Sequence, residues 1–196
     1  MQARAIQETI RSVDVQEFGE PQRIGVMGAS GTAGAELIRL LQNHPRAEVT
    51  CATARQSAGV SLQEIDPGAP DVQLCHPDDV VLSDLDVVFL CLPHGAAAAA
   101  ARKSAAAGVR TIDLSGDLRL HDESLHEATY GTERDARLAR SAVYGLTEFA
   151  RDEIRTALVV SNPGCYPTCA AMALLPLAEA DRLGDTIVID AKSGVS

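Results

Sequence analysis

Aromatic side chains are scarce in this sequence. Among 196 residues there are three Tyr, three Phe and no Trp, although hydrophobic residues make up 46% of the chain. The core must therefore be built from aliphatic side chains and alanine. Long apolar runs are missing too: none approaches the ~20 residues that span a bilayer, so no membrane segment is expected.

Positive charge is also in short supply. Seventeen Lys and Arg stand against 27 Asp and Glu, which gives a net charge of −10. A nucleic-acid-binding domain normally carries a basic patch, and no cluster of Lys and Arg occurs here. Nucleic acid is therefore excluded as a partner, and the acidity is interpreted as a contribution to solubility.

The cysteines do not form a disulfide or metal pattern. There are five of them, and no secretory signal precedes them, so we expect a cytoplasmic protein without a disulfide framework. Cys51 and Cys91 lie in apolar runs and are expected to be small core residues. The pair Cys165 and Cys169 lacks a second Cys/His pair, so no metal site is predicted.

Strands and helices alternate from Arg23 onward, which predicts an α/β fold: a Rossmann-type, mostly parallel sheet with helices on both faces. Strands are expected at residues 23–27, 48–53, 86–92, 109–114, 158–160 and 186–190, with helices after the first, third and fifth of them, the last at 167–183. Residues 115–154 are more polar and are expected to be rich in loops.

Three regions follow from this pattern. Residues 1–22 are mixed in charge and are interpreted as an N-terminal extension. Residues 23–155 are predicted to form a nucleotide-binding domain. Residues 156–196 are predicted to begin a second, α+β catalytic and dimerisation domain that is incomplete in this sequence.

A glycine-rich turn joins the first strand to the first helix. Its sequence is Gly-Ala-Ser-Gly-Thr-Ala-Gly at residues 28–34, and a second strand follows the helix. Such a turn lets a pyrophosphate approach the backbone at a helix N-terminus. The candidate cofactor-binding residues are Gly28, Ser30, Gly31, Thr32, Ala33 and Gly34. A glycine turn without a ligand is the alternative interpretation.

The residues after the second strand predict which dinucleotide binds. An NAD site usually has Asp or Glu there, whereas this stretch contains Thr53, Arg55 and Ser57 and no acid. A guanidinium suits the 2′-phosphate of NADP, because it can form a bidentate charged pair. We therefore predict NADP, selected mainly by Arg55; the alternative is that Arg55 is a solvated surface residue.

A thiol stands where a helix is expected to begin. Cys165 follows Pro163 and Gly164 and precedes an apolar helical pattern. A helix N-terminus favours the thiolate, which is the nucleophilic form, and Asn162 with nearby backbone N–H groups would stabilise an oxyanion. Spacing alone leaves two interpretations open, a catalytic nucleophile or an inert buried cysteine. Cys169, one turn later, is expected to be packed.

Six motifs in order identify a resemblance: RIGVMGASGTAGAEL, VVFLCLPHG, TIDLSGDLRL, VYGLTE, SNPGCYPT and DAKSGVS. Together they resemble the N-acetyl-γ-glutamyl-phosphate reductase family of arginine biosynthesis. The family usually has Pro where Thr147 stands. The resemblance implies an NADP-dependent oxidoreductase: the Cys165 thiolate attacks an acyl phosphate and expels phosphate, and hydride from NADPH reduces the thioester to a semialdehyde. It also implies a homo-oligomer in the full-length form.

The resemblance assigns further residues. It places Ser115, Asp117, Arg119, Glu148 and Asn162 near the substrate, although Asp117 and Arg119 could instead form a local ion pair that orders the loop. In the same way Leu92, Pro93 and His94 are expected to line the cofactor cleft, and Ser193 and Gly194 to form a turn near the nicotinamide.

One part of the family pattern is missing. The family's acid–base histidine lies in a later segment, and none of His44, His76, His94, His121 and His126 matches its motif. The chain is therefore expected to be a truncated form that binds cofactor but lacks a proton donor. Two alternatives stay open: a reductase of carrier-bound aminoadipyl phosphate in lysine biosynthesis, and an inactive NADP-binding module. The SNPGCYPT run argues against an aspartate-semialdehyde dehydrogenase.

Overall fold

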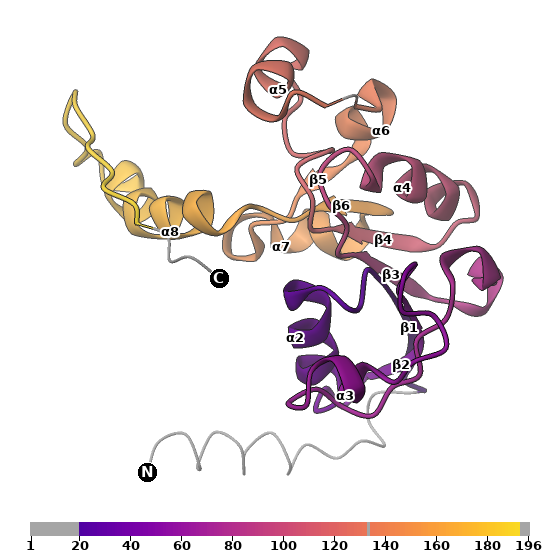
Figure 1. The fold of residues 1–196 in the computed structure, drawn as a ribbon. Coiled ribbons are helices and arrows are strands. Elements are labelled where there is room, and N and C mark those ends of the chain that lie inside the picture. The colour runs from indigo at the N-terminus through magenta and orange to yellow at the C-terminus, as the bar shows by residue number, and fades with distance from the viewer. Residues whose placement is uncertain (1–19, 133, 193–196) are drawn as a thin grey trace, which may run out of the picture. The chain divides into compact units, whose positions relative to one another are not determined.

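The computed structural model describes residues 20–132 and 134–192, which fall into two compact units (Figure 1). The first unit contains the described residues up to Cys91, together with Ala106–Arg110. The second contains Leu92–Ala105 and the described residues from Thr111 onward.

The first unit is built on three parallel strands in the order β2-β1-β3. Its elements are β1 (Gln22–Met27), α2 (Thr32–Leu41), β2 (Ala47–Thr53), α3 (Leu62–Ile65), β3 (Val87–Leu90) and the short 3₁₀ helices η2 (Pro77–Asp79) and η3 (Leu82–Asp84). Three consecutive residues of β1, from Ile24 to Val26, are buried. A central parallel strand is covered on both faces, which explains why no charged or polar side chain interrupts residues 24–27.

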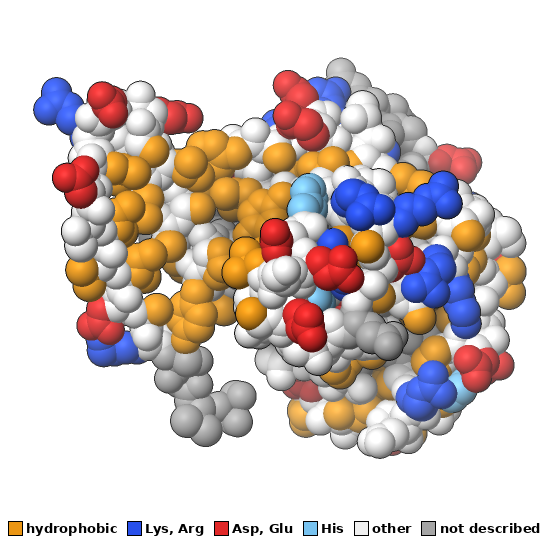
Figure 2. Space-filling view, turned by 90° about the horizontal axis from the view of Figure 1, so that it is seen from above, with side chains coloured by type: hydrophobic (Ala, Val, Ile, Leu, Met, Phe, Trp, Pro, Cys, Tyr) orange, Lys and Arg blue, Asp and Glu red, His pale blue; other side chains and the backbone are white. Residues whose placement is uncertain are grey.

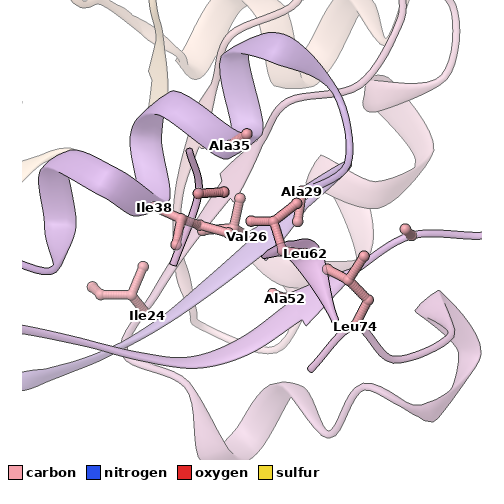
Figure 3. Close-up of a cluster of buried hydrophobic side chains, with 10 residues drawn as sticks. Ile24, Val26, Ala29, Ala35, Ile38, Ala52, Leu62 and Leu74 are labelled. Carbon is pink, nitrogen blue, oxygen red and sulfur yellow. The ribbon is translucent and has the colours of Figure 1, made fainter. Parts of the chain in front are cut away.

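Helix α2 packs on this sheet through one face. Ala35 and Ile38 lie one turn apart and are buried, while Leu40 is exposed. Figure 3 shows them beside Ile24 and Val26 of β1. The buried members of this cluster are all Ile, Val, Leu or Ala, so the aliphatic core predicted from the scarcity of aromatics is confirmed.

The second unit has three further parallel strands in the order β4-β6-β5. Its elements are α4 (Ala97–Ala106), β4 (Arg110–Asp113), α5 (Glu123–Tyr130), α6 (Ala136–Ser141), β5 (Val143–Tyr144), α7 (Thr147–Thr156), β6 (Val159–Ser161) and α8 (Cys165–Glu179). All strand pairings in both units are parallel and helices alternate with them, which confirms the predicted fold class.

Residues 115–154 are more helical than expected, since they contain α5, α6 and α7. Side chains cap two of these helices. Asp122 accepts a hydrogen bond from the N–H of Leu125 (2.8 Å), and Asp135 accepts one from the N–H of Leu138 (2.9 Å). Asp at the N-cap favours a helix even where the sequence is polar. Asp122 and Asp135 were therefore helix signals in the segment for which loops were expected.

Helix α8 begins at Cys165, two residues earlier than predicted, and none of its residues is buried. Figure 2 shows apolar side chains gathered over this part of the second unit. The strand expected at residues 186–190 is wrong: these residues pair with no strand of the described chain, and Val188 is 87% exposed. An apolar alternation forms a strand only when a neighbour completes the hydrogen-bond ladder.

Helices of the described residues are all too short or too polar to cross a bilayer. Within the same residues no three His, Cys, Asp or Glu side chains gather as a metal site would require.

Candidate active site

The turn between β1 and α2 is held against the end of β2. The carbonyl oxygen of Thr53 accepts hydrogen bonds from the N–H groups of Gly28 (3.1 Å) and Ala29 (2.8 Å). Gly28 has a φ of 82°, a left-handed value that favours glycine. At Gly34 an added Cβ would lie 2.4 Å from the carbonyl oxygen of Gly28, so helix and turn approach too closely for a side chain.

Gly31 is a glycine of this turn that the protein's own packing does not require. Its φ of −79° suits any residue, and an added Cβ would come no closer than 3.5 Å to another atom. As N-cap of α2 it offers no side-chain hydrogen bond, and Ser30, Thr32 and Ala33 around it are exposed. The first N–H groups of α2 are therefore open to an anion.

The end of β2 adds two polar groups without partners. Thr53 is 1% exposed, and its hydroxyl oxygen has no hydrogen-bond partner among the described residues. Arg55 is exposed and makes no hydrogen bond or ion pair within residues 20–132 and 134–192. Ser57 is half-buried, and its carbonyl accepts the N–H of Val60 (3.2 Å). An unpaired cation and an unpaired hydroxyl fit a phosphorylated ligand.

In the second unit Asp117 caps α4. Its carboxylate accepts hydrogen bonds from the N–H groups of Gly95 (2.7 Å), Ala97 (3.0 Å) and Ala98 (3.1 Å). Asp117 is 0% exposed. The direct substrate contact expected from the resemblance does not match this geometry, because one oxygen accepts from Gly95 in the turn before α4 and the other from Ala97 and Ala98 in its first turn. Asp117 instead positions the loop that carries His94.

Ser115 is likewise buried in a local network rather than open to substrate. Its hydroxyl donates to the carboxylate of Asp113 (3.0 Å) and accepts the N–H of Asp117 (3.0 Å). Burial raises the pKa of the Asp113 carboxyl, while the hydrogen bonds from Ser115 act in the opposite direction. Ser115 thus links the end of β4 to the residue that caps α4.

Arg119 holds the loop before Cys165. Its guanidinium donates to the carbonyl oxygens of Asn162 (2.8 Å) and Leu114 (2.6 Å) and reaches the hydroxyl of Tyr130 (3.4 Å). The proposed ion pair between Arg119 and Asp117 is absent from the described residues, so that interpretation is wrong. The reason is that Asp117 is occupied by α4 and Arg119 by backbone carbonyls.

An aromatic cluster on α5 was not predicted. The Tyr130 ring lies 5.0 Å from the His94 ring and 5.3 Å from the His126 ring. The N–H of Gly116 donates to Nδ1 of His94 (2.7 Å). Because Nδ1 is the acceptor, the ring proton of His94 lies on Nε2. A tyrosine in a polar segment of an aromatic-poor chain was the available signal.

Cys165 is exposed at the first position of α8, after the N-cap Gly164. The N–H groups of Cys165 and Tyr166 have no hydrogen-bond partner among the described residues. An added Cβ on Gly164 would lie 3.1 Å from the Arg119 guanidinium, so glycine leaves that contact room. Cys169 is exposed as well, because α8 buries no residue. The expectation of a packed Cys169 is therefore wrong.

A family model described as the semialdehyde dehydrogenase NAD-binding domain matches residues 23–157. This chain belongs to the semialdehyde dehydrogenase family. Solved semialdehyde dehydrogenases share its fold. Aspartate semialdehyde dehydrogenase II from Vibrio cholerae superposes with a TM-score of 0.62 at 18% identity, over 82% of this chain and 47% of that one. An enzyme of the same name with NADP from Candida albicans gives 0.60 at 18% identity, over 83% and 48%.

The curated relatives compared with this chain carry one name. N-acetyl-gamma-glutamyl-phosphate reductase of Laribacter hongkongensis is 43% identical over 179 residues, 89% of this chain and 52% of its own length. The chloroplastic protein of Arabidopsis thaliana, named a probable N-acetyl-gamma-glutamyl-phosphate reductase, is 43% identical over 89% of this chain and 44% of its own length. The chain therefore spans about half the length of the curated relatives it matches.

The remaining predicted site residues are placed as follows. Leu92 is half-buried and Pro93 exposed, both just after β3. The side-chain amide of Asn162 donates to the carbonyl of Pro163 (3.2 Å). Glu148 is exposed in the first turn of α7. The expected nicotinamide turn at residues 193–194 (Ser193 and Gly194) lies outside the described residues.

Proposed function

We propose that this chain is the nucleotide-binding and thiol-bearing part of an NADP-dependent reductase. Its substrate would be N-acetylglutamyl 5-phosphate, reduced to the 5-semialdehyde with release of phosphate through a thioester on Cys165. The observation that carries the proposal is the exposed Cys165 at the start of α8, with two unpartnered N–H groups beside it. The name shared by the relatives supports acetylglutamyl over a carrier-bound aminoadipyl substrate.

The thiol-bearing loop is suited to acyl transfer. The sulfur of Cys165, exposed at the start of α8, is the nucleophile that attacks the carbonyl carbon of the acyl phosphate. The carbon–sulfur bond forms, the carbon–oxygen bond to phosphate breaks, and inorganic phosphate leaves. The N–H groups of Cys165 and Tyr166 are available to the oxyanion that develops, and Arg119 fixes the loop through the Asn162 carbonyl.

The cofactor site is supported by the first unit. Residues 28–34 would receive the pyrophosphate, the unpaired Thr53 hydroxyl lies at the same turn, and Arg55 would pair with the 2′-phosphate. When bound, NADPH supplies the hydride that reduces the thioester. A cytoplasmic location remains our proposal for this chain; the Arabidopsis relative is named as chloroplastic.

The direct test is acylation of the thiol. Incubation of the chain with N-acetylglutamyl 5-phosphate is expected to release phosphate and leave one acyl group on Cys165, detected by mass spectrometry. Cys165→Ser should show neither, and Cys169→Ser should behave as the parent chain. Acyl transfer of equal extent in the Cys165→Ser variant would refute the assignment. Phosphate-dependent reduction of NADP by the semialdehyde then separates full turnover from cofactor binding alone.

The thiol itself should be more reactive than its neighbour. A helix N-terminus stabilises an anion by about 0.3–1 kcal/mol, so iodoacetamide at pH 7 should alkylate Cys165 about two- to fivefold faster than Cys169. Both cysteines are exposed on the same helix, which makes Cys169 an internal control. Peptide mapping over time gives the two rates; equal rates would contradict activation by the helix.

Arg55 should decide between NADPH and NADH. Arg55→Ala removes the charged partner of the 2′-phosphate, so the dissociation constant of NADPH is expected to rise about 10- to 100-fold while that of NADH stays unchanged. Arg151, an exposed arginine on α7, provides the matched control as Arg151→Ala. Isothermal titration calorimetry measures the dissociation constants of NADPH and NADH. An unchanged preference for NADPH in Arg55→Ala would contradict the assignment.

Gly31 separates binding from folding. Gly31→Ala adds a methyl group that the protein can hold, so the melting temperature should stay equal or rise slightly. The same methyl group stands where a pyrophosphate would approach the turn, so NADPH should bind at least about tenfold more weakly. A variant that binds NADPH as the parent does would show that the pyrophosphate lies elsewhere.

A further inference from the structure

Two thiols of the first unit face each other beside the end of β2, on the same strand as the proposed cofactor residue Thr53. Cys51 lies on β2, and its sulfur is 3.7 Å from the sulfur of Cys75. Backbone hydrogen bonds fix Cys75 beside the end of β2: its N–H donates to Ala52 (2.9 Å), and its carbonyl accepts from Ala54 (3.1 Å). Both side chains are half-buried, so Cys51 is not the fully packed core residue expected from the sequence.

The pair opens onto a cavity. A hollow of about 450 Å³ is lined by Cys51 and Cys75 and, from the segment that follows, by Val80, Val81 and Leu85. These aliphatic side chains offer an apolar wall beside the sulfurs. The cationic wall residue Arg23 is already paired with Asp86 (3.0 Å). The wall also carries Thr50 and the carboxylates of Asp79 and Asp84, so a reagent that reaches the thiols meets one apolar side and one polar side.

The spacing of the sulfurs suits a single bridging atom. Two thiolates bound at about 2.3 Å to one centre lie roughly 3.5–3.7 Å apart for bond angles of about 100–109°, close to the 3.7 Å found here. A disulfide needs about 2.05 Å. Cys75 is also bridged to Thr53, two residues beyond Cys51, so the pair is diagonal across the strands rather than directly opposed. Direct oxidation to a disulfide would require the side chains to rotate until the sulfurs are about 2.05 Å apart.

An atom bound by Cys51 and Cys75 receives two ligands from the protein, so it must carry any further ligand itself. Within the described residues no third Cys, His, Asp or Glu joins the pair, so a metal ion that needs three or four protein ligands is not satisfied. Burial and the contact with Cys75 raise the pKa of the Cys51 thiol to about 12, so it resists reagents that need a free thiolate. Binding to arsenic also requires the loss of both thiol protons, which leave in the water that forms.

We propose that Cys51 and Cys75 form a binding site for trivalent thiophilic species that carry their own third ligand, of which organoarsenicals are the matching class. With phenylarsine oxide as the probe, two arsenic–sulfur bonds form, both arsenic–oxygen bonds break, and the two thiol protons leave with the oxygen as water. Oxidation states do not change, and no further reactant is needed. The phenyl group occupies the apolar side of the cavity.

The test uses the full chain with Cys165→Ser and Cys169→Ser, which removes the other closely spaced pair of cysteines. The reduced protein is treated with one equivalent of phenylarsine oxide in excess glutathione, which strips arsenic from single thiols but not from a chelating pair. Intact-mass spectrometry should show one arsenical per chain. The melting temperature should rise by roughly 5–10 °C, because the bridge closes a loop between β2 and residue 75.

Adding Cys51→Ser or Cys75→Ser to this background should abolish both the adduct and the rise in melting temperature. Circular dichroism checks that each variant folds, and tryptic mapping of the unmutated pair should show peptides 47–55 and 56–102 joined through arsenic. An adduct that survives either substitution would overturn the proposal. So would the absence of an adduct in the parent background, or its replacement by a Cys51–Cys75 disulfide.

Discussion

Replacing Asp117 with alanine is expected to lower the free energy of unfolding by about 3–5 kcal/mol. Asp117 is fully buried, and its carboxylate is the acceptor for the N–H groups of Gly95, Ala97 and Ala98. Its removal leaves three donors at the start of α4 without an acceptor, and each buried unsatisfied group costs about 1–3 kcal/mol. In a chain of this size the melting temperature should fall by roughly 10 °C.

The segment that Asp117→Ala destabilises can be located by hydrogen exchange. Hydrogen exchange followed by mass spectrometry should speed up in residues 93–98, where the three donors lie. Asp117→Asn keeps one acceptor oxygen and is expected to fall between the parent and the alanine variant. Asp152→Ala on α7, where the side chain is exposed, should change neither quantity. Unaltered exchange at residues 93–98 in Asp117→Ala would show that the cap does not hold this loop.

Gly34→Ala is expected to destabilise the first unit by about 1–3 kcal/mol and to weaken NADPH binding at least about tenfold. Gly34 lies in α2, where alanine is normally preferred over glycine by about 1 kcal/mol. Here the added Cβ would lie 2.4 Å from the carbonyl oxygen of Gly28 and 2.8 Å from Cα of Ala29. Both are backbone atoms of the cofactor turn, so relief requires the turn or the helix to move.

The sign of the change in unfolding free energy of Gly34→Ala distinguishes two effects: helix propensity predicts a more stable variant, and steric overlap a less stable one. Chemical denaturation followed by circular dichroism measures it, since the chain has no Trp to report by fluorescence. Gly31→Ala, three residues earlier, is the matched control: it should weaken NADPH binding without loss of stability. A Gly34→Ala variant more stable than the parent would mean that α2 and the turn are farther apart than 2.4 Å implies.

Local patterns were sufficient to predict the strand, turn and helix that carry the proposed nucleotide site. The apolar run of β1, the glycines of residues 28–34 and the periodicity of α2 lie within about 20 consecutive residues. Each is set by hydrogen bonds and contacts between near neighbours in the chain. The absence of an acid after β2 and the presence of Arg55 were also visible without tertiary structure, as was the position of Cys165 at a helix start.

Contacts between distant segments were not predictable in the same way. The carboxylate of Asp117 meets Gly95, 22 residues away, and the guanidinium of Arg119 meets Asn162, 43 residues away. The sequence assigned both side chains to the substrate, because a buried cap and a backbone clamp use the same residue types as a binding site. Only the folded chain shows which hydrogen bonds Asp117 and Arg119 already make.

The sequence by itself determined the alternation of strands and helices, the aliphatic core, the glycine turn and the thiol at the start of α8, because these depend on residues that are close in the chain. Tertiary structure alone decided that Asp117 and Ser115 are buried supports and that the ring of Tyr130 lies against the rings of His94 and His126. It also decided that Cys51 faces Cys75 and that residues 186–190 have no strand partner. Burial and strand pairing depend on which distant segments come into contact, and hydrophobic periodicity along the chain does not predict those contacts.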